Sequence, residues 1–381
     1  KMDFDVEDFD GGYTDEMGEY CKRDVEVTTK LYKYLTTALK KKGFSDLSIR
    51  LEHEVADITA QQVANGFKLD VPVATQWQTE MSDRIDEIAS ELQERFPPIV
   101  TIRVSEKTGK RLKDSVEQFN VGSRQQIAKR LSKLGVKWKK KTPSGAPMVD
   151  ESTLAEVDLP EAKLCAEYLG LVKLKGMVDS WLKYVDPETH RIHGYVNSCG
   201  AVTGRMTHNK PNLAQIPSLK IARECFTVED GNVLVGCDAS GLELRCLAHY
   251  MNDDNYTKQI LEGDIHSFNQ HAAGLPERFM AKTMIYGLIY GAGDAKLGQI
   301  VGGGAKEGKK IRDTFFTQIP VLSNLIEKAK GIAQRTKRIN GIDGRMIKVD
   351  EDYKVLNRLL QSCGAIVMKV AVRNCCHKLD E

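Results

Sequence analysis

The apolar run VLVGC at residues 233–237, which ends directly at Asp238, constrains the fold of this chain most. Such a run is typical of a β-strand that is covered on both faces, so it predicts a sheet near the middle of the chain. Ser240 and Glu243 follow ahead of three leucines in the Ser-x-x-Glu pattern of a capping box, which predicts a helix. Asp238 then has no capping role, and it could be either a ligand for a hard cation or a structural carboxylate.

A second motif, RFMAKTMIYGLIYGAG at residues 278–293, predicts a helix with a chemically unusual face. Arg278, Lys282, Tyr286 and Tyr290 recur every four residues and therefore share one broad side of that helix. Two cations at a helix N-terminus, where the dipole also favours anions, form a site for a polyphosphate. The two tyrosines offer flat surfaces to a base and a sugar. A solvated amphipathic helix would carry intervening acidic residues, and this stretch has none.

Apolar periodicity in the rest of the chain predicts an α+β protein with a helical majority. The length of 381 residues allows two or three domains. Besides residues 233–237, strands are expected at residues 192–199, with a short extended piece at 67–70 and a basic loop or hairpin at 101–113. Short helices and turns are expected from there to about residue 184. Longer helices are predicted at residues 17–42, 48–65, 72–95, 242–250, 276–290, 306–316, 320–336 and 354–379.

The charge of the chain is distributed unevenly, although its net value is only +2. Residues 101–150 hold 13 Lys and Arg against 4 Asp and Glu, whereas residues 1–30 hold 4 against 10. A phosphate backbone could lie on the first segment and would be repelled by the second. Nine cysteines without Cys-x-x-Cys spacing predict buried thiols in a reducing cell. We see no run that approaches the ~20 apolar residues of a membrane span and no apolar leader, so we expect an intracellular protein without membrane contact.

The wording DASGLELRCLAHY and KTMIYGLIYGAG resembles motifs A and B of the family A DNA polymerases, the group of bacterial DNA polymerase I. The similarity is greatest to replicative polymerases of short-tailed phages. It extends to TGRMTHNKPNLAQIP at 203–217, GDIHS at 263–267 and LNRLLQSCGA at 356–365. The resemblance implies a right-hand polymerase fold, with a palm sheet, helical fingers and a helical thumb, preceded by the C-terminal tail of an exonuclease domain.

The resemblance also implies roles in catalysis and nucleotide binding. Asp238 and the carbonyl of Ala239 would bind the two Mg²⁺ ions that activate the primer hydroxyl and clamp an incoming dNTP. Arg278 and Lys282 would hold the triphosphate, with Lys282 also donating a proton to the leaving pyrophosphate. His266, which alone reads as an ordinary helix-start histidine, is similar to the family's phosphate-contacting histidine.

Other implied roles concern the sugar, the new base pair and the DNA. Glu243 resembles the steric gate, bonded to Tyr286, that leaves no room for a ribose 2′-hydroxyl. Tyr at position 286 suggests tolerance of dideoxynucleotides, and Tyr290 would stack at the template side of the pair. A further set would donate to the minor groove near the primer end, where every correct pair offers acceptors. This primer-template set consists of Arg205, Gln215, Asn357 and Gln361.

The N-terminal part resembles the third motif of the family's proofreading exonuclease, with Tyr20 to orient a water and Asp24 to bind metal. A tyrosine followed four residues later by an aspartate on a helix is by itself weak evidence for an exonuclease. The acidic residues between Asp3 and Asp10 do not form the Asp-x-Glu context that such an activity needs, so we expect only an exonuclease remnant. The second metal carboxylate of the polymerase is expected in a His-Asp-Glu turn beyond the end of the chain, with Asp380 and Glu381 as helix-surface residues.

The resemblance divides the chain into five parts. These are the end of a 3′-5′ exonuclease-like domain at 1–45, thumb and connecting helices at 46–190, palm with motif A at 191–262, fingers with motif B at 263–340, and a return to the palm at 341–381 that stops before motif C. Only a short basic segment, about residues 100–118, stands where some phage relatives carry a long thumb insertion. We therefore expect no thioredoxin dependence, and that segment is either a DNA contact or a solvated loop.

The expected function is template-directed DNA synthesis in viral replication, by a monomeric enzyme acting on primer-template DNA and dNTPs in the cytoplasm of an infected bacterial host. A single-subunit RNA polymerase is an alternative, although Glu243 argues against it because such an enzyme must admit the 2′-hydroxyl. A non-catalytic DNA-binding fragment is another, although that role would not need a triphosphate site.

Overall fold

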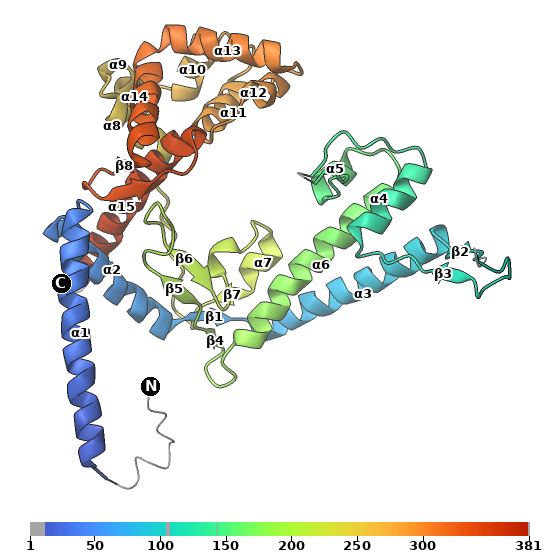
Figure 1. Cartoon of the computed structure of the whole chain (residues 1–381), viewed down its shortest axis with the longest axis horizontal. Helices are drawn as coiled ribbons and strands as arrows, with labels where there is room; N and C mark the ends of the chain where they lie inside the picture. Colours follow the sequence, from blue (N-terminus) through green and yellow to red (C-terminus); the bar gives the residue numbers. More distant parts are fainter. Residues whose placement is uncertain (1–11, 104–106, 143, 380–381) are drawn as a thin grey trace. The chain divides into compact units, whose positions relative to one another are not determined.

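The computed structural model describes residues 12–103, 107–142 and 144–379 of the chain (Figure 1). They form two compact units. The first unit comprises the described parts of Lys1–Gln61, Val196–Thr207 and Gly236–Glu381, and the second comprises Gln62–Tyr195 and His208–Val235. Two paired strands, β5 (Tyr195–Asn197) and β6 (Thr207–Asn209), lie where the chain passes between the units.

The second unit is built on two helices of 25 residues each, α3 (Val71–Arg95) and α6 (Pro160–Tyr184), which run alongside each other (Figure 1). Asp70 caps α3 by accepting a hydrogen bond from the amide of Val73 (3.1 Å). Its other elements are β1 (Phe67–Leu69), β2 (Ile99–Thr101), β3 (Ser115–Glu117), α4 (Arg124–Lys133), α5 (Glu151–Ala155), β4 (Arg191–Ile192), a 3₁₀ turn at Leu213–Gln215, α7 (Lys220–Glu224) and β7 (Phe226–Thr227). An antiparallel sheet of strand order β4-β1-β7 joins distant parts of this unit.

The sequence analysis missed α6, because it predicted only short helices and turns up to residue 184. Three helices of the same unit, α3, α4 and α5, pack against α6. A helix that is covered on several sides carries apolar residues around most of its circumference, and so it lacks the one-sided periodicity on which the prediction relied. The hairpin expected near residues 101–113 is present as the paired strands β2 and β3.

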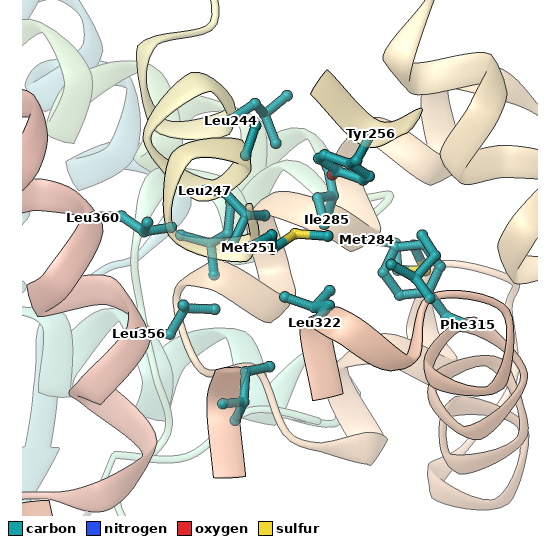
Figure 2. Close-up of a cluster of buried hydrophobic side chains, with 14 of the residues drawn as sticks. Leu244, Leu247, Met251, Tyr256, Met284, Ile285, Phe315, Leu322, Leu356 and Leu360 are labelled. Atoms are coloured by element: carbon teal, nitrogen blue, oxygen red, sulfur yellow. The ribbon is translucent and has the colours of Figure 1, made fainter. Parts of the chain in front are cut away.

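The first unit is helical, and its core lies among the helices between Leu242 and Leu379. Its elements are α1 (Asp15–Lys41), most of α2 (Asp46–Asn65), α8 (Leu242–Met251), α9 (Asp254–Leu261), α10 (Ile265–Ala273), α11 (Arg278–Ile289), α12 (Asp294–Gln299), α13 (Ala305–Gln318), α14 (Pro320–Thr336), β8 (Arg338–Asn340), β9 (Met346–Lys348), a 3₁₀ turn at Asp352–Lys354 and α15 (Val355–Leu379). Figure 2 shows the core, where Leu247, Met284 and Leu322 come together from three different helices. The predicted long helices are confirmed to within a few residues at each end.

The predicted strand at residues 233–237 is wrong, since this segment has no regular secondary structure. Val233 and Val235 are 80% and 87% exposed. A strand needs a neighbour to receive its backbone hydrogen bonds, and no described strand pairs with this segment. The apolar run therefore stays uncovered.

The predicted capping box at Ser240 and Glu243 is also wrong. Gly241 is the N-cap of α8, with φ of 59°, and no side chain caps this helix. Glycine adopts this left-handed conformation without steric cost, so the chain turns into α8 through backbone geometry alone. The carbonyl of Ser240 accepts a hydrogen bond from Nε of Arg245 (2.9 Å).

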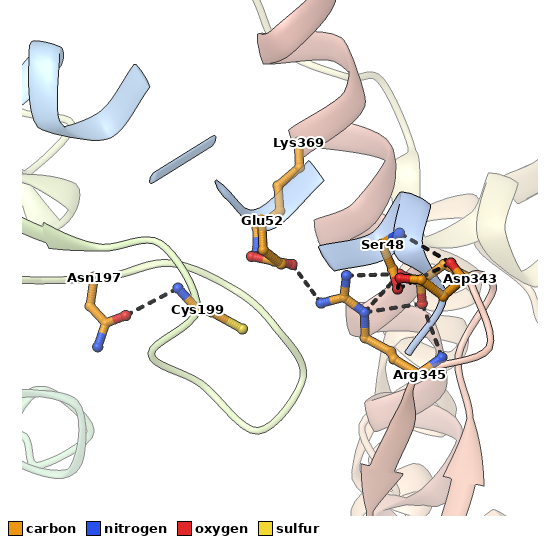
Figure 3. A network of polar contacts seen from close by, with 8 residues as sticks. Ser48, Glu52, Asn197, Cys199, Asp343, Arg345 and Lys369 are labelled. Carbon is orange, nitrogen blue, oxygen red and sulfur yellow. Dashed lines mark hydrogen bonds and ion pairs between the residues drawn. The ribbon is translucent and has the colours of Figure 1, made fainter. Parts of the chain in front are cut away.

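A buried ionic network anchors α15 to α2 and to the β8–β9 hairpin (Figure 3). One carboxylate, that of Glu52, lies 2.6 Å from Nζ of Lys369 and 2.6 Å from Nη1 of Arg345. The same arginine pairs with Asp343 (2.7 Å). Both cations are almost fully buried, and removing one partner would leave an uncompensated charge. The segment Asp352–Leu379 is long and apolar enough to cross a membrane, but 56% of its most apolar window is buried, as in a core helix.

The five-part domain division stays a prediction, since the two compact units follow different boundaries. Residues Asp3 to Asp10, Asp380 and Glu381, on which two further predictions depend, lie outside the described residues. The same holds for residues 104–106 of the basic segment.

Candidate functional site

Helix α11 presents its chemically distinctive face outward because its opposite face is locked into the core. Ala281, Met284, Ile285 and Ile289 are all at most 1% exposed and belong to the core of the first unit. Buried residues at this helical spacing fix the rotation of the helix. Arg278 and Lys282 are exposed as a consequence, and Tyr286 is half-buried.

Arg278 is held by a carboxylate that the sequence analysis passed over. Its Nε and Nη2 donate to the two oxygens of Asp264, at 2.6 and 2.9 Å. Asp264 is also the N-cap of α10, where it accepts a hydrogen bond from the amide of His266 (3.0 Å). The hydrogen bonds from Arg278, followed by that from Ser267, hold the pKa of the Asp264 carboxyl well below its usual range. An Asp immediately before a helical pattern is an N-cap signal, and that signal could have found it.

His266 joins the two cations of α11. Its ring centroid lies 6.4 Å from that of Tyr286, and its Nδ1 is buried without a hydrogen-bond partner in the structure. Burial lowers the pKa of His266, and so does the charge of Arg278; the charge of Asp264 opposes this effect, and that of Lys282 adds to it. These side chains therefore lie within electrostatic reach of one another. Lys282 makes no ion pair with a described residue. The structure thus brings together His266, Arg278, Lys282 and Tyr286, which we call the α11 cluster.

Glu243 faces the far end of α11, but it bonds a different tyrosine from the one predicted. The hydroxyl of Tyr290 donates to the two oxygens of Glu243, at 2.9 and 3.2 Å. The predicted Glu243–Tyr286 hydrogen bond is therefore wrong. Burial raises the pKa of Tyr286, and the charge of Glu243 raises it further, so Glu243 still lies near both rings. One turn of helix separates the two tyrosines, and the hydroxyl of Tyr290 is the one that reaches the carboxylate.

Three members of the predicted primer-template set belong to the first unit. Arg205 and Gln361 both lie close enough to Tyr290 to lower its pKa, although burial and the bond to Glu243 raise it overall. Asn357 is one turn before Gln361 on α15, and its Nδ2 is buried without a hydrogen-bond partner. Gln215 is exposed and belongs to the second unit.

Asp238 lies in the irregular segment that precedes α8. It is exposed and makes no hydrogen bond or ion pair with a described residue. Its carboxylate and the carbonyl of Ala239 are oxygen donors of the kind that Mg²⁺ prefers. Within the described part of the chain, however, no group of three or more His, Cys, Asp or Glu residues could hold a metal ion. The donor chemistry fits magnesium, whereas the number of donors does not complete a site.

Tyr20 and Asp24 lie one turn apart on α1, a helix in which no residue is buried. Their spacing agrees with the exonuclease pattern, and no further observation tests it. Their role stays a prediction.

The comparisons with known proteins agree on one family. The model of DNA polymerase family A matches residues 92–381. The DNA-directed DNA polymerases of Enterobacteria phage T3 and Escherichia phage T7 are each 34% identical to the chain, over 94% of its length and 66% of theirs. DNA polymerase I of Pseudomonas aeruginosa is 26% identical, over 96% of the chain and 41% of the relative.

A solved structure supports the fold. The POL domain of Pol1 from M. smegmatis, in complex with DNA primer-template and dNTP, matches with a TM-score of 0.74 and 24% identity. The match covers 88% of the chain and 61% of that domain. This likeness confirms the α+β polymerase fold expected from the sequence. The chain spans about two thirds of the length of the phage polymerases, and it belongs to DNA polymerase family A.

Proposed function

We propose that this chain carries out template-directed DNA synthesis, by transfer of a nucleotide from a dNTP to a primer 3′-hydroxyl. The observation that carries the proposal is the α11 cluster. Two exposed cations, a histidine and a tyrosine lie together beside a helix N-terminus, which is the arrangement that a nucleoside triphosphate requires. DNA binding alone would not need it.

In this reaction the primer hydroxyl loses its proton to water and its oxygen bonds to the α-phosphorus. The bond from the α-phosphorus to the oxygen that bridges to the β-phosphate breaks, and pyrophosphate leaves. Arg278, Lys282 and His266 hold the phosphates and offset their charge. Lys282 donates a proton to the leaving pyrophosphate. Tyr286 and Tyr290 line the place of the base and sugar, and Glu243 excludes a ribose 2′-hydroxyl from it.

The primer-template DNA is the second substrate in this proposal. Arg205, Gln215, Asn357 and Gln361 donate hydrogen bonds to the minor groove near the primer end, which tests the shape of a base pair without reading its sequence. Enzymes of this family use divalent metal ions. We propose two Mg²⁺ ions, with Asp238 and Ala239 among their ligands.

The phage relatives support a role in viral DNA replication. We propose the cytoplasm of a bacterial host as the place of this activity. We also propose that the enzyme is monomeric and does not use thioredoxin. The short β2–β3 hairpin at the position of the thumb insertion supports the second point.

The test is primer extension by the 381-residue chain on primed single-stranded DNA with Mg²⁺ and either dNTPs or rNTPs, beside a gel-shift on the same primer. Extension with dNTPs alone supports the proposal. Extension with rNTPs would indicate an RNA polymerase. DNA binding without extension would favour the non-catalytic alternative.

A further inference from the structure

We infer that Asp264 is a positioning residue, which holds the guanidinium of Arg278 in place before the triphosphate arrives. This inference rests on the proposed function. It assigns a role to a side chain that lies beside the α11 cluster and is not itself a phosphate ligand.

The contacts of Asp264 account for all of its acceptor capacity. Oδ1 accepts from the amide of His266 (3.0 Å) and from Nη2 of Arg278 (2.9 Å). Oδ2 accepts from the hydroxyl of Ser267 (2.8 Å) and from Nε of Arg278 (2.6 Å). A carboxylate offers about four lone-pair sites, and here each is used. Because Asp264 is fixed at the start of α10, its two hydrogen bonds also fix the position of the Arg278 guanidinium.

The same contacts leave Arg278 able to bind a phosphate. A guanidinium has about five N–H donors in a rigid fork, and Asp264 takes two of them. The remaining donors stay available on an exposed side chain. Because the rotamers of Arg278 are already restricted, phosphate binding has less side-chain entropy to remove. Pre-ordering one such side chain corresponds to about a two- to tenfold gain in affinity.

The negative charge of Asp264 acts in the opposite direction, since it repels a polyphosphate. The Asp264 and Arg278 side chains are 42% and 53% exposed, so water and salt screen this repulsion. The two effects predict opposite signs for the substitution Asp264→Asn. Loss of positioning weakens triphosphate binding, whereas loss of repulsion strengthens it.

The chain contains a matched control for this substitution. Asp253 caps α9 by accepting a hydrogen bond from the amide of Tyr256 (2.7 Å), and it has no cationic partner among the described residues. Asparagine is as good an N-cap as aspartate, so both D264N and D253N keep their helix starts. Only D264N removes a carboxylate that forms an ion pair with an arginine.

The experiment measures equilibrium binding of a dNTP and of the corresponding dNMP to the chain on a primer-template that ends in a dideoxynucleotide. We expect D264N to bind the dNTP about two- to tenfold more weakly than wild type, with unchanged affinity for the dNMP and for the DNA. D253N should behave as wild type. In an R278A background, D264N should cause no further loss, because Asp264 acts through Arg278.

Equal or tighter dNTP binding by D264N would overturn the inference, and so would a loss that persists in the R278A background. Failure of the proposed function looks different, since wild type itself would then bind no dNTP.

Discussion

The α11 cluster and the segment that carries Asp238 both contain residues that resemble motifs of one polymerase family, but the packing around them differs. Three members of the α11 cluster lie on α11, and the opposite face of this helix is buried in the core. The fourth, His266, lies on α10. The segment at residues 233–240 is irregular, and Val233 and Val235 are mostly exposed. One motif is placed by contacts within its own helical unit, whereas the other has no described strand to pair with.

The difference teaches which kind of site a local stretch of chain can build. A helix satisfies its own backbone, so a packed inner face is enough to orient the side chains on its outer face. A strand depends on hydrogen bonds to another strand, which can be remote in sequence. We therefore expect phosphate binding to depend on the α11 cluster and to be independent of order at Asp238.

The largest effect that tests the difference between the α11 cluster and the Asp238 segment is expected from Lys282→Ala. Loss of a proton donor and phosphate ligand should lower the rate of nucleotide incorporation by about two to four orders of magnitude. Stability should not change, because Lys282 is exposed. Single-turnover incorporation measures this effect. Lys306→Ala, which removes an exposed lysine of α13, is the control, and an equal loss in both variants would refute the assignment.

The two regions should also differ in stability. Ile285→Ala removes a fully buried side chain beneath the α11 cluster and should destabilise the protein by about 2–5 kcal/mol. Val235→Ala removes an exposed one and should change stability by no more than about 0.5 kcal/mol. Urea unfolding monitored by circular dichroism compares them. Similar losses for both would mean that residues 233–237 are packed after all.

Glu243 tests whether the far end of α11 selects the sugar. Glu243→Ala should lower the preference for dNTP over rNTP by about 10- to 200-fold, the usual range for a change in pocket fit. Tyr290→Phe keeps the carboxylate and removes only the hydrogen bond to it, so its effect on selectivity should be smaller than that of Glu243→Ala. Competitive incorporation of the two nucleotides provides the measurement. Unchanged selectivity in Glu243→Ala would exclude the steric gate.

The smallest expected effect concerns pH. The pKa of His266 is lowered by burial and then by the charge of Arg278, against the opposing charge of Asp264 and with a further contribution from Lys282, so the fold favours the neutral ring. The contribution to stability is complete above the ordinary pKa of about 6.5 and is lost as pH falls through the lower folded value. His266→Gln should therefore lose less stability than wild type between about pH 7.5 and 5.5. His271→Gln, on the exposed side of the same helix, provides the reference, and identical losses in all three proteins would contradict the prediction.

The sequence was informative where structure is local. The ends of α2, α11 and α14 follow to within two residues from apolar spacing and punctuation. The four-residue repeat places Arg278, Lys282 and Tyr286 on one face of α11, whereas Tyr290 is the C-cap of that helix and bonds Glu243. Prediction failed where partners are distant. No pattern near residue 233 shows whether a neighbouring strand exists, and the choice of Glu243 between Tyr286 and Tyr290 depends on the packing of α8 against the core.

The most direct test of the account is equilibrium binding of a dNTP in EDTA, where Asp238 cannot act through a metal. If the α11 cluster alone holds the triphosphate, wild type binds, and the double variant Arg278→Ala, Lys282→Ala loses about a hundredfold in affinity or more, since each charged hydrogen bond contributes about 1.5–3 kcal/mol. If wild type binds no dNTP until Mg²⁺ is added, the α11 cluster alone does not hold the triphosphate and the account is contradicted.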